Sequence, residues 1–410
     1  MKYVQLLSTL LLLLVLNSSA QVLNTLRIDP SNLTGGTVSE IFDEANFIPL
    51  ETSKYSLFSS IDQLEVTPQY FIILDKQTNA LLIFNKNGKF HAKIKGERIG
   101  YKNGRTMTMF LFDSVTGVIN IPSSSEENVM ISFNYDAVQT GKHKSAFDSY
   151  SNVFYLANGV NFYNNYLADI GYTSLNTFEL FVARKDSVLK RYFPYNRKYE
   201  PLTNRDILYG GRKNSFYYSG TESTALFVRS YDYNIYRLTQ DSLNIAYQVV
   251  LPLKNTLPEN FRSDTTLAGK RIKFLQNNPS LIYGISNVYQ LGNHLFFNLK
   301  SWGYENNYSL VYNLHSGNQI DIQKISPDEK SFFFSITDST VGGGEFINKG
   351  FLNTDGQYIY TSYSALRFFS QYELNSDKKS QLPPTLSNYL KKGSKSDNPL
   401  IIQLKPKAIL

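Results

Sequence analysis

The amino-acid sequence predicts an all-β fold, a six-bladed β-propeller, from one repeated pattern. Short strands separated by polar turns recur at near-constant spacing, which indicates small antiparallel sheets arranged around a common axis. The clearest copies of this unit are Tyr70–Ile94, Ala225–Val250 and His294–Ile322. The 30 tyrosines and 28 phenylalanines agree with this fold, because aromatic residues favour strands and fill the gaps between blades.

Residues 1–20 are expected to be a secretory signal peptide and not part of the fold. Lys2 supplies a positive charge, Leu6–Leu16 is an apolar run too short for a membrane span, and Ser18–Ala20 offers small residues for cleavage. Residues 21–410 are then expected to form a single propeller domain. Because the chain contains no cysteine, a lipid-modified cysteine is excluded, and we expect a periplasmic or extracellular protein without a lipid anchor.

Six blades are expected in chain order. The predicted bounds are 57–96, 106–147, 150–194, 205–252 and 281–325, with the sixth blade beginning at Ser331–Ser335 and including Tyr358–Thr361. Within the third blade, strands are expected at Asn152–Leu156, Tyr166–Asp169 and Phe178–Ala183. Short helices are expected in the blade connections, at Leu267–Leu275 and Ala365–Leu374, and Pro383-Pro384 is expected to break the chain.

A propeller must close its ring, and one terminus usually supplies a strand to the sheet built by the other. Asn46–Glu51 reads as the clearest early strand, and Pro399–Leu404 reads as the last one. We therefore predict that these two segments lie in the same sheet.

The charge of the chain does not predict a nucleic-acid partner. The net charge is +7, spread along the sequence, and the densest basic cluster is Lys391, Lys392 and Lys395. A nucleic-acid surface would show a concentrated basic stripe with aromatic residues between the charges. We expect a monomer without a membrane span.

Familiar catalytic and metal-binding motifs do not occur. The four histidines do not pair at metal-ligand spacing, and the lack of cysteine excludes thiolate zinc sites, so neither a metal nor a cofactor is expected. Gly342–Glu345 is rich in glycine but is expected to be a flexible connection. Glu126 and Glu127 would suit glycosidase chemistry if their carboxylates were about 5–10 Å apart, but adjacent carboxylates in a loop are usually just solvated. No residue is assigned a catalytic role.

A ligand-binding face follows from the predicted topology. Loops between the second and third strands of each blade gather on one face together with the loops between blades. The residues expected there are Asp75, Lys76, Tyr101, Arg105, Glu126, Glu127, Tyr231, Tyr233, Trp302 and Tyr304. Trp302, the single tryptophan, has two interpretations: an exposed ring that stacks on a sugar or a protein partner, or a ring that folds back between blades.

The predicted segments together resemble the exported six-bladed β-propeller proteins of bacterial envelopes, a family related to the NHL-repeat propellers and without an established activity. The matching stretches are Phe47–Glu51, Tyr70–Ile94, Tyr233–Leu238 and Asp397–Ile402. The resemblance covers about residues 40–405. Members often carry a Gly-Pro-Gly-Glu-Tyr segment after the first blade, whereas residues 96–105 here keep the glycines without the proline, so the role of that loop does not transfer.

The sequence therefore predicts a non-enzymatic propeller that binds a glycan, a peptide or an envelope protein. Two alternatives stay open: a carbohydrate-active lyase or hydrolase with its site at the channel mouth, and a structural scaffold. An enzyme should concentrate titratable groups with shifted pKa values in one pocket, whereas a binding module should show scattered polar groups and exposed aromatic rings.

Overall fold

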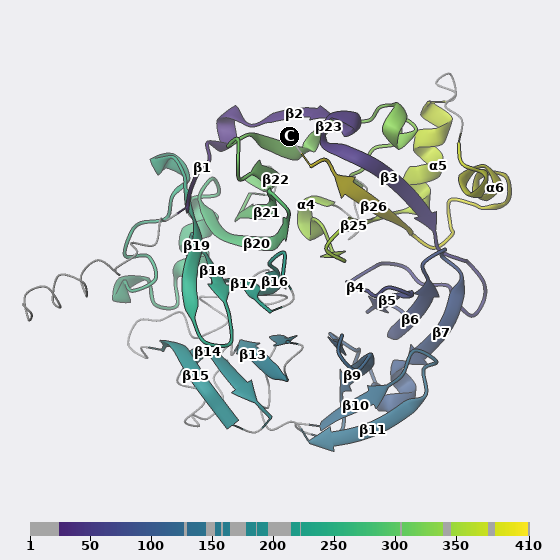
Figure 1. Cartoon of the computed structure of the whole chain (residues 1–410), viewed down its shortest axis with the longest axis horizontal. Coiled ribbons are helices and arrows are strands. Elements are labelled where there is room, and N and C mark those ends of the chain that lie inside the picture. The colour runs from purple at the N-terminus through teal and green to yellow at the C-terminus, as the bar shows by residue number, and fades with distance from the viewer. Residues whose placement is uncertain are drawn as a thin grey trace, which may run out of the picture.

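In the computed structural model, six small sheets are arranged around a central axis (Figure 1). The structure describes residues 24–126, 129–144, 152–156, 159–164, 178–185, 187–195, 215–221, 223–303, 306–338, 346–375 and 382–408. The predicted signal peptide lies outside these residues, as do Glu127, Tyr304, Tyr166–Asp169 and Gly342–Glu345. The predicted six-bladed propeller is confirmed.

Blades one to three each contain four antiparallel strands in chain order. Blade one contains β4 (Gln63–Val66), β5 (Tyr70–Asp75), β6 (Ala80–Asn85) and β7 (Phe90–Lys95). Blade two contains β8 (Leu111–Asp113), β9 (Val118–Pro122), β10 (Val129–Phe133) and β11 (Gln139–Lys144). Blade three contains β12 (Asn152–Tyr155), β13 (Val160–Asn164), β14 (Phe178–Arg184) and β15 (Ser187–Pro194).

Blades four to six each include one strand from the N-terminal part of the chain. Blade four contains β16 (Phe216–Tyr218), β17 (Ala225–Val228), β18 (Asn234–Leu238), β19 (Leu243–Val250) and β1 (Asn24–Arg27). Blade five contains β20 (Ile282–Leu291), β21 (His294–Ser301), β22 (Tyr308–Asn313), β23 (Gln319–Ser326) and β2 (Thr34–Thr37). Blade six contains β24 (Asn353–Thr354), β25 (Ile359–Tyr363), β26 (Leu400–Pro406) and β3 (Phe42–Pro49).

The ring closes in blade six, where the C-terminal strand β26 pairs antiparallel with the N-terminal strand β3. The register joins Leu400 to Pro49 and Leu404 to Ala45. The predicted pairing of the segments near 46–51 and 400–404 is therefore confirmed.

The residues before β3 form an N-terminal belt, residues 24–37, that the sequence did not lead us to expect. Within it, β1 adds to the outer edge of blade four, and β2 adds to the outer edge of blade five. Both additions are parallel. Figure 1 shows the belt and β3 running along the rim of three successive blades.

Side chains at the strand ends explain several of the turns. Asp75 ends β5 and accepts a hydrogen bond from the Thr78 hydroxyl at 2.6 Å, and Asp113 ends β8 and accepts one from the Thr116 hydroxyl at the same distance. A short polar side chain that bonds the following backbone favours a turn. Gly117 completes the second turn with a φ of 69°, a conformation that glycine adopts without strain.

Apolar clusters fill the spaces between neighbouring blades, as the aromatic composition led us to expect. Ile72 and Leu81 of blade one pack with Ile119 and Ile131 of blade two. On the other side of blade one, Phe71 meets Tyr360 of blade six with 5.9 Å between ring centroids. The blades are therefore held to one another mainly by buried side chains.

The expected start of blade six was wrong. Residues around Ser331–Ser335 form no strand; the 3₁₀ helix Glu329–Ser331 is followed by Phe332 and Phe333, which have φ values of 55° and 61°. The innermost strand is instead β24. Pro383-Pro384 does not simply break the chain either, because Pro384 opens a helix, a position where proline lacks no needed hydrogen bond.

The helices are short and lie in the connections. Among the described residues, the α-helices are α2 (Val38–Ile41), α3 (Arg271–Asn277), α4 (Phe346–Lys349), α5 (Ala365–Leu374) and α6 (Pro384–Lys392). The other 3₁₀ helices in this part of the chain are Pro30–Asn32, Gly96–Ile99, Leu253–Asn255 and Thr265–Leu267. The α5 bounds match the prediction, and α3 begins four residues later than predicted. Within the described part of the chain, none of the helices has the length and apolarity to span a membrane.

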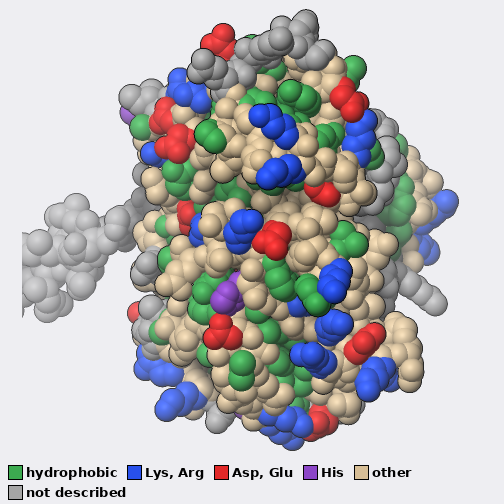
Figure 2. Space-filling view, turned by 90° about the vertical axis from the view of Figure 1, so that its right-hand side faces the viewer, with side chains coloured by type: hydrophobic (Ala, Val, Ile, Leu, Met, Phe, Trp, Pro, Cys, Tyr) green, Lys and Arg blue, Asp and Glu red, His purple; other side chains and the backbone are tan. Residues whose placement is uncertain are grey.

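The surface shown in Figure 2 carries basic and acidic side chains interspersed with apolar ones. No concentrated basic stripe is visible on this face, in agreement with the even spread of charge along the sequence.

Candidate functional site

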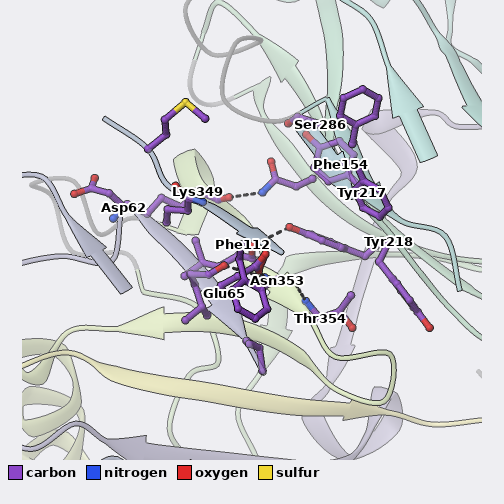
Figure 3. A pocket seen from close by; sticks show the side chains of 18 of the residues that line it. Asp62, Glu65, Phe112, Phe154, Tyr217, Tyr218, Ser286, Lys349, Asn353 and Thr354 are labelled. Atoms are coloured by element: carbon purple, nitrogen blue, oxygen red, sulfur yellow. Dashed lines mark hydrogen bonds between the residues drawn. The ribbon is translucent and has the colours of Figure 1, made fainter. Parts of the chain in front are cut away.

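A cavity of about 910 Å³ lies on the propeller axis, where the innermost strands of all six blades face one another (Figure 3). Its walls come from β4, β8, β12, β16, β20 and β24, with further residues from β21 and from the connection before β24. The volume falls within the range typical of small-ligand sites, which is about 300–1,000 Å³.

Aromatic side chains make up much of the cavity wall. The rings that line it are Phe110, Phe112, Phe154, Tyr155, Phe216, Tyr217, Tyr218, Tyr283, Tyr289 and Trp302. Tyr217 and Tyr289 are almost fully buried and meet at 81° with 5.5 Å between their centroids. Trp302 is half-buried and packs partly against a small apolar cluster that includes Tyr231 and Leu257.

Glu65, on β4, places a carboxyl group at the cavity wall. The Asn353 side-chain amide donates to the Glu65 carboxylate and also to the backbone carbonyl of Leu64. Burial raises the pKa of Glu65 to about 7, and the hydrogen bond from Asn353 opposes this shift. The Glu65 side chain retains some accessible surface because it borders the cavity, so a ligand can reach it.

Two lysines also line the cavity. The Lys300 amine, on β21, donates to the Ile347 carbonyl at 3.2 Å, and burial lowers the pKa of Lys300 to about 8. The Lys349 amine donates to the Ile61 carbonyl at 2.8 Å. The Lys349 contact bridges blades six and one near Asp62, another residue of the cavity wall.

A β-bulge in β20 shapes one wall of the cavity. The pairing of β20 with β21 shifts between Ser286 and Tyr289, and Asn287 has a φ of 53°. The Asn287 amide donates to the carbonyls of Lys349 and Phe351, each at 2.7 Å. The bulge thereby fastens blade five to blade six beside the cavity, a location where bulges often re-aim side chains.

Ser286, next to the bulge, has a hydroxyl group without a hydrogen-bond partner among the described residues. Its oxygen is buried and lines the cavity, yet within the described residues it makes no hydrogen bond. Buried hydroxyl groups in proteins are nearly always bonded to protein, water or ligand. The cavity wall thus offers a polar group whose bonding capacity is unused.

The cavity wall holds two carboxyl groups, two amines, several hydroxyl groups and aromatic rings. In the parts of the chain that the structure describes, no group of three or more histidine, aspartate or glutamate side chains is placed to hold a metal ion. The wall can therefore bind a ligand through hydrogen bonds, charge and ring contacts.

Of the residues predicted from the sequence to bind ligand, the structure places Trp302 at the cavity. Tyr231 and Tyr233 lie where residues 252–281 pack against blades four and five. The Tyr231 ring contacts Phe261 at 5.1 Å between centroids, and the Tyr233 hydroxyl donates to the Ile282 carbonyl at 2.6 Å.

The other predicted residues are not brought together with Trp302. Asp75 is fully buried and accepts from the backbone and hydroxyl of Ser59, and Lys76 follows it in the turn. The hydroxyl of buried Tyr101 donates to the Pro122 carbonyl at 2.8 Å, and exposed Arg105 donates to the Ser124 carbonyl at 2.9 Å. Exposed Glu126 forms an ion pair with Lys142. Tyr304 and Glu127 lie outside the described residues.

Sequence reasoning missed Glu65, Lys300, Ser286 and Tyr289. A signal for Glu65 was present in Leu64-Glu65-Val66, where an acidic residue alternates with apolar ones and must face away from the core. Lys300 lies near the end of a largely apolar strand, where a charged residue is unusual. Neither pattern reveals that the innermost strands converge on one cavity.

The chain is similar to several solved structures at low sequence identity, and one of them has a TM-score above 0.5 and shares the fold. A protein of Bacteroides fragilis, described as a candidate exported protein, is 16% identical and aligns over 94% of this chain and 100% of its own, with a TM-score of 0.66. A member of the DUF4221 family from Bacteroides vulgatus is 12% identical over 90% of this chain and 98% of its own, with a TM-score of 0.46.

A virginiamycin B lyase from Staphylococcus aureus is 13% identical over 68% of this chain and 74% of its own, with a TM-score of 0.36. Likenesses as low as those of the lyase and the Bacteroides vulgatus protein bear on neither the site nor the activity of this chain. No curated protein matches the sequence significantly. Residues 24–405 match the family described as a domain of unknown function, DUF4934, and the protein is therefore a member of the DUF4934 family.

Proposed function

We propose that this protein is an exported β-propeller that captures a small organic ligand, such as a glycan or a peptide, in its axial cavity. The observation that carries the proposal is the cavity of about 910 Å³ with its aromatic and polar wall. Ligand sites are commonly concave and mostly apolar, with a few convergent polar groups. The apolar run at Leu6–Leu16 supports export, as does the likeness to the Bacteroides fragilis protein described as exported.

Trp302 supports ligand capture because it combines a large ring with a position at the cavity. Its side chain is half-buried, so part of the ring is available for contact. Tyr283 lines the same cavity, also half-buried, and belongs to the same small apolar cluster as Trp302. Aromatic residues of this kind provide much of the binding free energy in known interfaces.

An array of glycans and short peptides, probed with the full chain, tests the proposal. We expect at least one class of ligand to be retained, and we expect Trp302→Ala to weaken its binding by about tenfold or more. Tyr372→Ala is the matched control, because Tyr372 is an exposed aromatic residue on α5, away from the cavity. The proposal is contradicted if the protein retains no ligand on the array. It is also contradicted if Trp302→Ala binds as tightly as wild type and has the same melting temperature.

A second candidate is a carbohydrate-active lyase or hydrolase, and one observation favours it. The cavity gathers Glu65, whose pKa is raised to about 7, with tyrosines whose pKa values burial raises, including Tyr155, Tyr217 and Tyr289. A carboxyl group that titrates near neutral pH suits general acid-base catalysis. Product formation from the oligosaccharides that bind, followed as new reducing ends or unsaturated sugars, separates this candidate from pure binding.

A further inference from the structure

The Glu65 carboxyl group uses only one of its two oxygen atoms within the described part of the chain. Oε2 accepts from the Asn353 amide, which also donates to the Leu64 carbonyl. The Asn353 carbonyl oxygen accepts from the backbone N–H of Thr354 at 2.7 Å, so the amide is fixed with its NH₂ group toward Glu65. Oε1 accepts no hydrogen bond from a described residue, and Glu65 lines the axial cavity. The carboxyl group is therefore anchored through one oxygen and accessible to a ligand through the other.

No cationic side chain among the described residues neutralises the Glu65 carboxylate. Only burial and the hydrogen bond from Asn353 shift the pKa of Glu65, and burial is the larger cause. A lysine or an arginine close to the carboxylate would lower this pKa. Since Asn353 is neutral, ionised Glu65 leaves a negative charge on the cavity wall without a counter-charge from its neighbours.

The aromatic wall of the cavity suits a cation as well. Phe112 from blade two and Phe154 and Tyr155 from blade three line the same cavity as Glu65. The Glu65 charge also raises the pKa of the Tyr289 hydroxyl, so Tyr289 lies within electrostatic reach of the carboxylate. Ring faces attract ammonium groups, and proteins commonly bind organic ammonium ions between aromatic rings.

We propose that the ligand of the axial cavity carries a primary ammonium group, which donates a hydrogen bond to Oε1 of Glu65. This inference rests on the proposed function, since it names the chemical class of the ligand that the same cavity captures. Amino sugars and the N-termini of peptides both carry this group. The Ser286 hydroxyl, buried at the cavity wall without a partner among the described residues, offers a further bond to a hydroxyl or amide group of the ligand.

Two pairs of probes that differ only at the amine test the inference. The first pair is the linear glucosamine trimer and its fully N-acetylated form. The second pair is trialanine amide with a free N-terminus and the same peptide with an acetylated N-terminus. In calorimetric titrations of the full chain at pH 7, we expect at least one amine to bind roughly tenfold or more tightly than its acetylated counterpart, because acetylation removes a charge-assisted hydrogen bond. The pair that shows the difference identifies the source of the amine.

Glu65→Gln assigns the effect to the proposed carboxylate. Glutamine keeps the shape of the side chain but carries no negative charge, so the preference for the amine should disappear. Glu373→Gln is the matched control and should keep the preference, because Glu373 forms an exposed ion pair with Lys395 at the outer surface. Melting temperatures establish that each variant is folded.

Proton release during binding gives a second readout that needs no variant. The pKa of Glu65 is about 7, so at pH 6 the group is mostly protonated, and binding of an ammonium group should release close to one proton per ligand. The pKa of Lys300 is about 8, so Lys300 stays mostly protonated at pH 6. The other charged groups on the cavity wall are Asp62 and Lys349. Burial keeps the wall tyrosines protonated by raising their pKa values, as at Tyr155, Tyr217 and Tyr289. Titrations in two buffers of different ionisation enthalpy measure the release.

The outcomes separate this inference from the proposed function. Equal or tighter binding of the acetylated probe in both pairs overturns the ammonium assignment, and so does an unchanged preference in Glu65→Gln. Binding of an amine at pH 6 without proton release places its ammonium group away from Glu65 and likewise overturns the assignment. Failure of all four probes to bind overturns this inference, whereas failure of the whole array of glycans and peptides overturns the proposed function itself.

Discussion

Glu65 shows how a single position on an inner strand acquires unusual chemistry. Successive side chains of a strand point to opposite faces, so the Glu65 side chain points away from the apolar core. The face that it reaches borders the axial cavity and not open solvent. One amide, from Asn353, anchors the carboxylate. The raised pKa follows from this placement, and so does a dependence of stability on pH.

We predict that Glu65→Gln changes how stability varies with pH. The folded-state pKa of Glu65 is raised above its ordinary value of 4.5 to about 7, so its favourable contribution is complete below pH 4.5 and is lost as pH rises through 7. Glutamine cannot ionise. Between pH 4.5 and pH 8, the variant should gain about 1–3 kcal/mol in unfolding free energy relative to wild type, measured by urea denaturation. Parallel profiles for the two proteins would contradict the placement of Glu65, and Glu373→Gln serves as the exposed control.

At the scale of elements, β2 joins β23 with an irregular register. Thr34 pairs with Ile320, whereas Gly36 pairs with Ile325, so the two chains come close together around Gly35. A Cβ atom on Gly35 would lie 2.1 Å from the Lys324 carbonyl oxygen. Only a residue without a side chain permits this approach.

Gly35→Ala should therefore weaken the attachment of β2 to blade five. We expect a loss of about 1–3 kcal/mol in unfolding free energy, because an added methyl group must displace backbone. Gly284→Ala is the matched control, since a Cβ atom there meets nothing within 4 Å. Hydrogen exchange of β2 amides and chemical denaturation measure the effect, and equal stability of the two variants would show that β2 can shift without loss.

At the scale of the whole molecule, the N-terminal belt and the closing strand β3 have separable roles. β3 completes the sheet that joins the ends of the chain, whereas β1 and β2 add to blades that already have four strands. Leu26, Ile28 and Leu33 of the belt are nevertheless buried, so the belt also covers apolar surface.

Two deletions distinguish these roles. Removing residues 21–52 should abolish cooperative unfolding, because blade six loses its outer strand and the ring opens. Removing residues 24–37 should lower the melting temperature and leave a single cooperative transition. Calorimetry provides both measurements. A wild-type melting curve for the longer deletion would mean that β3 does not close the ring.

The sequence predicted the propeller well because its evidence is local and repeated. The strands of Tyr70–Ile94 are short runs rich in apolar residues that end in recognisable turns, and the same unit recurs in blades four and five. Blade six was harder, since its inner strand has two residues and Phe332–Phe333 resemble a strand in composition. Parallel addition of β1 and β2 leaves no pattern at all, and Thr34–Thr37 contains two glycines, which disfavour strands.

The candidate site was less predictable for a geometric reason. Trp302 attracted notice as the single tryptophan, but Glu65, Ser286 and Lys300 are ordinary residues in ordinary strands. Their proximity arises from the convergence of distant blades, which no local pattern records. The bulge at Asn287 likewise depends on acceptors more than 60 residues away, at Lys349 and Phe351.

Pairing of β3 with β26 also determines when the propeller can complete its folding during synthesis. The Asn46 side-chain amide donates to the Gln403 side chain across 357 positions, so β3 leaves the ribosome long before its partner strand is synthesised. Until then β3 presents an unsatisfied edge, the kind of surface that recruits chaperones or aggregates. The ring therefore closes only after β26 has been synthesised, and a chain without β26 would leave the β3 edge unpaired.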